Sequence, residues 1–116
     1  MGERVVGLVG PCGAGKSTLA AALRARGILT REIAQEHSYV QEMWRLIAAP
    51  DVLIYLDVSH AEAQRRKGRE FPAPYWHTLN GRLGHARAHA DLCLNTDALA
   101  PEAVLARVLD FLEVVP

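Results

Sequence analysis

The sequence predicts an α/β fold built on a small parallel β-sheet, and three observations lead to this prediction. Short apolar runs alternate with stretches of helical periodicity along the 116 residues. One run, VLIYLDV at 52–58, is continuously apolar, which is typical of a central parallel strand covered on both faces. A glycine-rich turn also joins the first strand to the first helix. We therefore expect three layers, with about four parallel strands and helices on both faces.

The expected strands are short apolar segments at 4–9, 28–33, 52–58 and 91–95. Between the second and third strands, only 34–49 remain, which is room for one helix and no further strand. We expect that helix at 38–48 and expect it to be amphipathic, because Val40, Met43, Trp44 and Ile47 recur at helical spacing. The whole chain, 1–116, is expected to form a single domain.

The remaining helices are expected at 16–26, after Ser59, at 75–90 and at 101–112. Ser59 is a suitable N-cap with Glu62 as its capping-box partner, and Gly81 and Gly84 interrupt the helix at 75–90. The segment 65–74 is polar and punctuated by glycine and proline, so it is expected to be a loop or a mobile lid. The lid region as a whole is placed near 65–80.

Composition narrows the possible partners. Half of the residues are apolar but no run approaches the length of a membrane span, so no membrane partner is expected. The formal net charge is zero, so nothing in the charge balance favours nucleic acid. Cys12 and Cys93 lie far apart, with Cys93 in a strand expected to be buried, and no signal peptide opens the chain. These features favour a reducing cytoplasm.

The stretch GPCGAGKS at 10–17 satisfies the Walker A pattern G-x-x-x-x-G-K-[ST], with a strand before it and a helix after it. Its glycines allow main-chain N–H groups to surround phosphate oxygens, and the following helix adds its positive end. Lys16 is expected to reach the β and γ phosphates, Ser17 to ligate Mg²⁺ and Thr18 to face the α phosphate. Cys12 is either a small filler or an oxidation switch. The expected ligand-binding residues are Gly10, Pro11, Cys12, Gly13, Ala14, Gly15, Lys16, Ser17 and Thr18.

Several further segments resemble known kinases. Thr30-Arg31-Glu32 resembles the TREP segment of thymidylate kinases, and PDVLIYLDV at 50–58 is very close to a segment that thymidylate and deoxynucleoside kinases share. RRKGREFPAPYWHTL at 65–79 is similar to the lid of those families, and 90–112 resembles the end of cytidylate and adenylylsulfate kinases. The chain thus resembles the P-loop kinase superfamily, in a shortened form of its deoxynucleoside and thymidylate kinases.

This resemblance implies transfer of the γ phosphate of ATP, or of GTP, with Mg²⁺. Lys16 would then be catalytic, and Glu32 would be the general base or would anchor a magnesium-bound water; alternatively, Glu32 is a solvated partner of Arg31. Arg65, Arg66 and Arg69 are candidates to close on the transferring phosphate, the alternative being a solvated charge run. Arg82 and Arg87 are second-line candidates on the next helix.

Asp57 admits two interpretations. By pattern it ends a Walker B strand and would be a metal-side residue with Ser17, whereas by resemblance it begins the lid helix. The families carry their metal-side acid in a D-R-[YH] or E-R-S motif, which is absent here. Relative to those families the chain lacks a helix–strand–helix piece, which implies a four-strand sheet in the order 2-1-3-4 and a shallow acceptor site that a second subunit of a homodimer would complete. The acceptor is expected along the segment 35–39 (Gln35-Glu36-His37-Ser38-Tyr39), together with Trp44 and Arg45. Gln35, His37 and Tyr39 either read polar edges of the acceptor or belong to a loop. Trp44 either stacks on a base or belongs to the core.

The leading expectation is therefore a small-molecule kinase that acts on a nucleoside, a nucleotide or a similar acceptor. A module that binds ATP and hydrolyses it slowly while acting through a partner is the alternative. A kinase of nucleic-acid 5′ hydroxyls is a weaker alternative, since the net charge is zero. His85-x-x-x-His89 places two imidazoles on one helical face, but that pattern alone is a weak signal for zinc.

Overall fold

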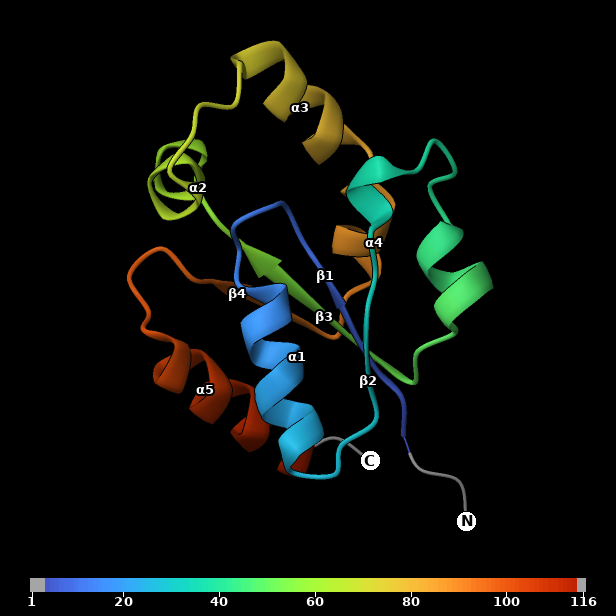
Figure 1. The fold of residues 1–116 in the computed structure, drawn as a ribbon. Coiled ribbons are helices and arrows are strands. Elements are labelled where there is room, and N and C mark those ends of the chain that lie inside the picture. Colours follow the sequence, from blue (N-terminus) through green and yellow to red (C-terminus); the bar gives the residue numbers. More distant parts are fainter. Residues whose placement is uncertain (1–3, 115–116) are drawn as a thin grey trace.

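The computed structural model describes residues 4–114 of the chain. The strands are β1 (Val6–Val9), β2 (Thr30–Glu32), β3 (Val52–Asp57) and β4 (Leu92–Asn95). The α-helices are α1 (Lys16–Ala25), α2 (His60–Lys67), α3 (Ala73–Gly81), α4 (Gly84–His89) and α5 (Pro101–Val114), with a 3₁₀ turn η1 (Gln35–His37) and a π-helix η2 (Trp44–Ala48) (Figure 1). None of the described helices is long and apolar enough to cross a membrane.

The four strands form one parallel sheet in the order β2-β1-β3-β4, which confirms the predicted topology. Val6 pairs with Thr30 on one side and with Val52 on the other, and Ile54 pairs with Leu92. Because all strands run the same way, their carboxyl ends meet at one edge of the sheet, where ligands of open α/β sheets bind. The glycine-rich loop after β1 lies at this edge, and α3 passes above it (Figure 1).

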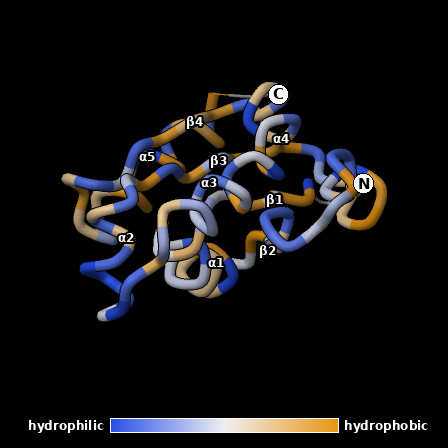
Figure 2. The backbone as a smooth tube through the Cα atoms, turned by 90° about the horizontal axis from the view of Figure 1, so that it is seen from above, coloured by the Kyte–Doolittle hydropathy of each residue, from blue (hydrophilic) through white to orange (hydrophobic). Residues whose placement is uncertain are grey.

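Helices cover both faces of the sheet, as predicted. On one face, Leu8 and Ile54 pack with Leu23 of α1 and Val108 of α5. On the other face, Val9, Leu53 and Tyr55 pack with Trp44 of η2 and with Leu83 and Ala86 at the start of α4. Figure 2 shows the resulting layers, with α1 and α5 on one side of the strands and α4 on the other. The sheet is therefore held between two apolar cores, one on each face.

The predicted amphipathic helix at 38–48 is wrong. Within this stretch only 43–48 is helical, mostly as the short π-helix Trp44–Ala48, and the chain from 38 to 42 forms turns and bends. The cause is Gln35, whose amide group binds the Val40 carbonyl at 2.8 Å and the Trp44 amide at 2.8 Å, and so competes with a regular helix. The predicted apolar stripe is consequently split: Trp44 is buried, but Val40 and Ile47 are 54% and 73% exposed.

Helix α2 extends further than the sequence suggested, so the predicted loop at 65–74 is wrong in its first residues. Arg65 and Arg66 lie on the helix, which ends at Gly68 in the left-handed conformation. Ser59 caps its start, accepting a hydrogen bond from the Glu62 amide as predicted, and Glu62 pairs with both arginines one turn later. The loop before α3 is therefore shorter, 68–72, and the predicted helix at 75–90 is split into α3 and α4.

Strand β2 is also shorter than predicted, and β4 is less buried. β4 lies at the edge of the sheet, and of its side chains only that of Leu94 is buried. Cys93 is exposed rather than buried, because it lies on an edge strand whose outer half is not covered. Its thiol sulfur lies 3.8 Å from the Arg87 carbonyl.

Candidate functional site

The loop between β1 and α1 needs glycine because two other elements pack closely against it. A Cβ atom on Gly10, whose φ is 149°, would lie 2.0 Å from the Leu56 carbonyl oxygen of β3. A Cβ atom on Gly13, at φ 89°, would lie 3.1 Å from Ala63 Cα of α2. The main chain of the loop can therefore lie against β3 and α2 only where these side chains are absent.

Helix α1 begins at Lys16, directly after this loop, with Gly15 as its N-cap at φ 102°. The first amide groups of a helix have no acceptor within the helix, and the helix dipole makes this end positive. The side chains of Ser17 and Thr18 in the same turn are exposed. Together these groups form a site suited to a phosphate chain.

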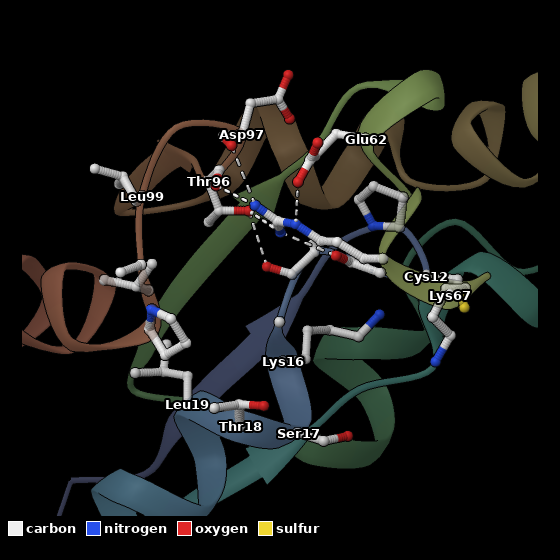
Figure 3. A pocket seen from close by; sticks show the side chains of 18 of the residues that line it. Cys12, Lys16, Ser17, Thr18, Leu19, Glu62, Lys67, Thr96, Asp97 and Leu99 are labelled. Atoms are coloured by element: carbon white, nitrogen blue, oxygen red, sulfur yellow. Dashed lines mark hydrogen bonds and ion pairs between the residues drawn. The ribbon is translucent and has the colours of Figure 1, made fainter. Parts of the chain in front are cut away.

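A cavity of about 910 Å³ opens beside the loop. It lies between α1, α2 and the segment that joins β4 to α5 (Figure 3). Its polar lining includes Lys16, Ser17, Thr18, Lys67 and Asp97, and its apolar lining includes Leu19, Ala22, Leu99, Val104 and Leu105. The volume is typical of a small-molecule site, and the lining offers both charged groups and apolar side chains to a ligand.

Lys16 is held by two oxygen atoms. Its ammonium group donates to the Gly10 carbonyl and to Glu36 Oε2, the latter over 2.8 Å. This ion pair is largely buried, since the side chains of Lys16 and Glu36 are 13% and 5% exposed. The sequence analysis placed Glu36 in the expected acceptor segment but did not predict its contact with Lys16; the available signal was an acidic residue in a polar turn after a strand.

Glu32 lies at the end of β2, beside the first turn of α1. Its Oε1 atom accepts a 2.7 Å hydrogen bond from Ser17 Oγ, and its Oε2 atom lies 3.8 Å from Arg24 Nη1. Arg31, the partner considered from the sequence, instead donates to the Ala48 carbonyl at 3.1 Å. Glu32, the predicted catalytic carboxylate, is thus in contact with Ser17, the predicted metal-binding hydroxyl.

The oxygen atoms around the loop fit Mg²⁺. Ser17 and Glu32 offer a hydroxyl and a carboxylate, and Glu36 Oε1 is buried without a hydrogen-bond partner among the described residues. Within 4–114 no three His, Cys, Asp or Glu side chains cluster to hold a metal ion by themselves. Mg²⁺ with a nucleotide does not need such a cluster, because it usually takes one or two carboxylates, the phosphates and water.

Asp57, the other metal candidate, is engaged elsewhere. One of its carboxylate oxygens pairs with Arg87 Nη2, and the other accepts from the Val58 amide at 2.9 Å. The Arg87 guanidinium also lies 4.9 Å from the centre of the Tyr55 ring. Burial, partly offset by Arg87, raises the pKa of the Tyr55 hydroxyl to about 12. Asp57 is not among the residues that line the cavity.

The three candidate lid arginines point to different places. Arg66 donates to the Gly13 carbonyl at 3.1 Å, to Thr96 Oγ1 at 2.9 Å and to Glu62 at 2.9 Å (Figure 3). Arg65 is exposed and pairs with the same Glu62, and their hydrogen bonds lower the pKa of Glu62 to about 2. The Arg69 guanidinium lies 4.9 Å from the centre of the Phe71 ring. Of these three arginines, only Arg66 therefore joins α2 to the glycine-rich loop.

The residues expected near an acceptor are mostly occupied or peripheral. Gln35 is fully buried and holds the backbone, while His37 and Tyr39 are exposed. Arg82 donates to the Glu36 carbonyl at 3.3 Å and lies 4.4 Å from the centre of the Tyr39 ring. Trp44 is a core residue, 6% exposed, whose indole donates to His85 Nδ1 at 3.1 Å.

The parallel sheet in this order, with a Walker A loop between its first strand and first helix, is the fold of the P-loop kinases. Among solved structures, the chain is similar to that of "deoxyadenosine kinase from M. mycoides with bound dCTP", with a TM-score of 0.66. The match covers 97% of this chain and 100% of the other, at 16% sequence identity, and therefore concerns the fold alone. No protein-family model and no curated protein matches the sequence.

Proposed function

We propose that this chain is a P-loop phosphotransferase that binds a magnesium nucleoside triphosphate, ATP or GTP, in the cavity beside α1. The observation that carries this proposal is the pairing of the loop's two key side chains with carboxylates: Lys16 with Glu36, and Ser17 with Glu32. A cation and a hydroxyl at a helix N-terminus bind phosphate oxygens, and carboxylates beside them complete a magnesium site.

In the proposed reaction, the oxygen of the acceptor attacks the γ phosphorus and the bond to the β-phosphate oxygen breaks. Lys16 and the amides of the loop neutralise the charge that develops on the phosphate oxygens. Glu32 receives the proton of the acceptor hydroxyl or orients a water of the metal. Ser17, with the carboxylates beside it, would hold Mg²⁺, and the bound ion would supply positive charge that neutralises the phosphate oxygens. Arg65, Arg66 and Arg69 remain the candidates to close the lid.

The acceptor that we propose is a nucleoside, a nucleotide or a similar small molecule. The likeness in fold to a deoxyadenosine kinase supports a nucleoside acceptor. The acceptor would lie beside η1, where Arg82 and Tyr39 form a cation–π pair near Glu36. Pairing with a second subunit in a homodimer would complete this side, and the cytoplasm is the compartment in which ATP and Mg²⁺ are supplied.

A second candidate function is a nucleotide-binding module that hydrolyses ATP slowly and acts through a partner. The observation that favours it is the exposure of large apolar side chains around η2: Tyr39, Val40, Leu46 and Ile47 are each more than half exposed. Apolar groups gathered on one surface often mark a protein interface. Phosphorylation of a nucleic-acid 5′ hydroxyl remains the weaker alternative, because the net charge is zero.

Incubation with γ-labelled ATP and a panel of nucleosides, nucleotides and sugars tests these functions. A phosphotransferase labels at least one acceptor, and Lys16→Ala and Glu32→Gln each abolish labelling, with ATP binding retained in Glu32→Gln. Release of free phosphate without any labelled acceptor would support the slow ATPase. If the wild type binds neither ATP nor GTP in the presence of Mg²⁺, both functions are wrong.

A further inference from the structure

We infer that Glu36 is the carboxylate that makes nucleotide binding depend on a divalent cation: it is the counter-ion of Lys16 in this structure and a metal-side ligand once phosphate takes Lys16. This inference rests on the proposed function. The carboxylate lies 2.8 Å from the Lys16 ammonium, and its second oxygen, Oε1, is buried without a partner among the described residues. An ionised oxygen buried in this way indicates that a further positive partner belongs beside it.

The position of Glu36 is fixed by its neighbours rather than by chance packing. Its backbone carbonyl accepts a hydrogen bond from Arg82 at 3.3 Å. The preceding residue, Gln35, is fully buried and binds the backbone of Val40, Arg82 and Trp44. These contacts hold the backbone of the turn η1 beside the loop, and from there the Glu36 carboxylate contacts Lys16.

Charge balance then determines what happens when a triphosphate binds. The phosphate oxygens compete with Glu36 for Lys16, because both are anionic and both need the same ammonium group. If the phosphate takes Lys16, the Glu36 carboxylate is left buried, beside a chain of like charges. Both effects oppose binding of a metal-free nucleotide. A divalent cation that arrives with the nucleotide offsets both the burial of an unpaired carboxylate and its repulsion by the phosphates, since the cation attracts the two anionic groups together.

The other carboxylates that line the cavity are less suited to this role. Glu62 is engaged by Arg65 and Arg66. Asp97 accepts a 2.8 Å hydrogen bond from the Ser59 amide, and Glu102 is exposed. Glu36 is the one of the four that contacts Lys16 and is itself buried. Glu32 is nearer to Ser17 but 35% exposed, so water can solvate it whether or not a metal is bound.

The test compares the dissociation constants of ATP with Mg²⁺ and with EDTA, measured by calorimetry, in the wild type and in Glu36→Gln. In Glu36→Gln, we expect metal-free ATP to bind more tightly than in the wild type, because its competitor for Lys16 is gone. The enhancement of affinity by Mg²⁺ should fall by about 10- to 100-fold, the range typical of lost groups around a metal. Glu42→Gln, which removes a half-exposed carboxylate outside the cavity, is the matched control and should leave both constants unchanged.

A second measurement does not depend on the folding of a buried variant. Mn²⁺ and ATP are added to Glu32→Gln in which glutamate carboxyl carbons are labelled with carbon-13, and the hyperfine coupling of Mn²⁺ to carbon-13 is recorded. The coupling should persist, because Glu36 is intact. Its loss would assign the metal to Glu32 and overturn the inference, as would weakening of both ATP forms by the same factor in Glu36→Gln. Failure of the wild type to bind ATP at all would instead overturn the proposed function.

Discussion

The Arg66 guanidinium donates a 2.9 Å hydrogen bond to Thr96 Oγ1, in the wall of the cavity beside α1. Thr96 is buried, and its hydroxyl also lies 3.0 Å from the Ala14 carbonyl of the glycine-rich loop. Helix α2, the loop and the turn after β4 thus meet at these two side chains. The wall of the cavity is a single hydrogen-bonded unit rather than three independent loops.

Arg66→Ala should therefore loosen the whole wall. We expect a loss of about 2 kcal/mol in the free energy of unfolding, because several hydrogen bonds from a charged donor are removed and carbonyl groups lose their partner. Arg66→Lys should recover only part of the loss, since an ammonium group cannot reproduce the guanidinium fork. Chemical denaturation measures the free energy of unfolding of both Arg66 variants. Arg65→Ala is the control and should change little, because Arg65 is exposed; equal losses in both variants would contradict the assignment.

Gly10→Ala should destabilise the fold as well as nucleotide binding. The added Cβ atom would lie 2.0 Å from the Leu56 carbonyl oxygen, at a φ that alanine rarely adopts, so β1 and β3 would have to separate. A loss of roughly 3 kcal/mol is expected for overpacking of this kind. Gly81→Ala, with no atom within 4 Å of the added Cβ, should be neutral or slightly stabilising. The melting temperatures of Gly10→Ala and Gly81→Ala, compared with that of the wild type, check this prediction.

Ser17→Ala should weaken nucleotide binding only in the presence of Mg²⁺. The hydroxyl contacts Glu32 and is exposed, so its removal should shift the melting temperature little. We expect the affinity for Mg-ATP to fall by about tenfold while that for metal-free ATP is retained. Thr78→Ala, an exposed hydroxyl on α3, is the control. An equal loss with and without Mg²⁺ would mean that Ser17 binds phosphate rather than metal.

Protonation of His85 should destabilise the fold below about pH 6.5. The pKa of His85 is lowered from 6.5, mainly by burial and then by His89 and Arg45, although Glu42 Oε1 lies 3.5 Å away. A lowered pKa means that the unfolded chain binds the proton more readily, so this contribution to stability is present above pH 6.5 and is lost as the pH falls. His85 Nδ1 also accepts from the Trp44 indole, which a protonated ring cannot do.

Thermal unfolding monitored by Trp fluorescence between pH 5 and pH 8 checks this prediction. The melting temperature of the wild type should fall on the acid side, and His85→Gln should show a smaller fall. His37→Gln, which removes an exposed imidazole, should follow the wild-type profile. If His37→Gln and His85→Gln flatten the profile equally, the contact between Trp44 and His85 is not the cause.

The central strand and the glycine-rich loop could be predicted from the sequence because both depend on local patterns, whereas the sheet order was predicted from the resemblance to kinase families. A continuously apolar strand at 52–58 and a motif with fixed spacing leave little freedom. Glu36 and Gln35 could not be assigned, because their roles depend on contacts with residues far along the chain, Lys16 and Arg82. The helix expected at 38–48 was wrong for the same reason: a buried amide outcompeted the helical periodicity of the side chains.

The direct pairing of β2 with β1 has a consequence for where the Glu32 carboxylate lies. Leu8 and Glu32 are partners in the register of these two strands, so the carboxylate ends one strand away from the glycine-rich loop. An interposed strand would move it outward by about 4.8 Å, too far for a hydrogen bond with α1. The small size of this sheet therefore makes its outermost strand the direct neighbour of the strand that leads into the loop.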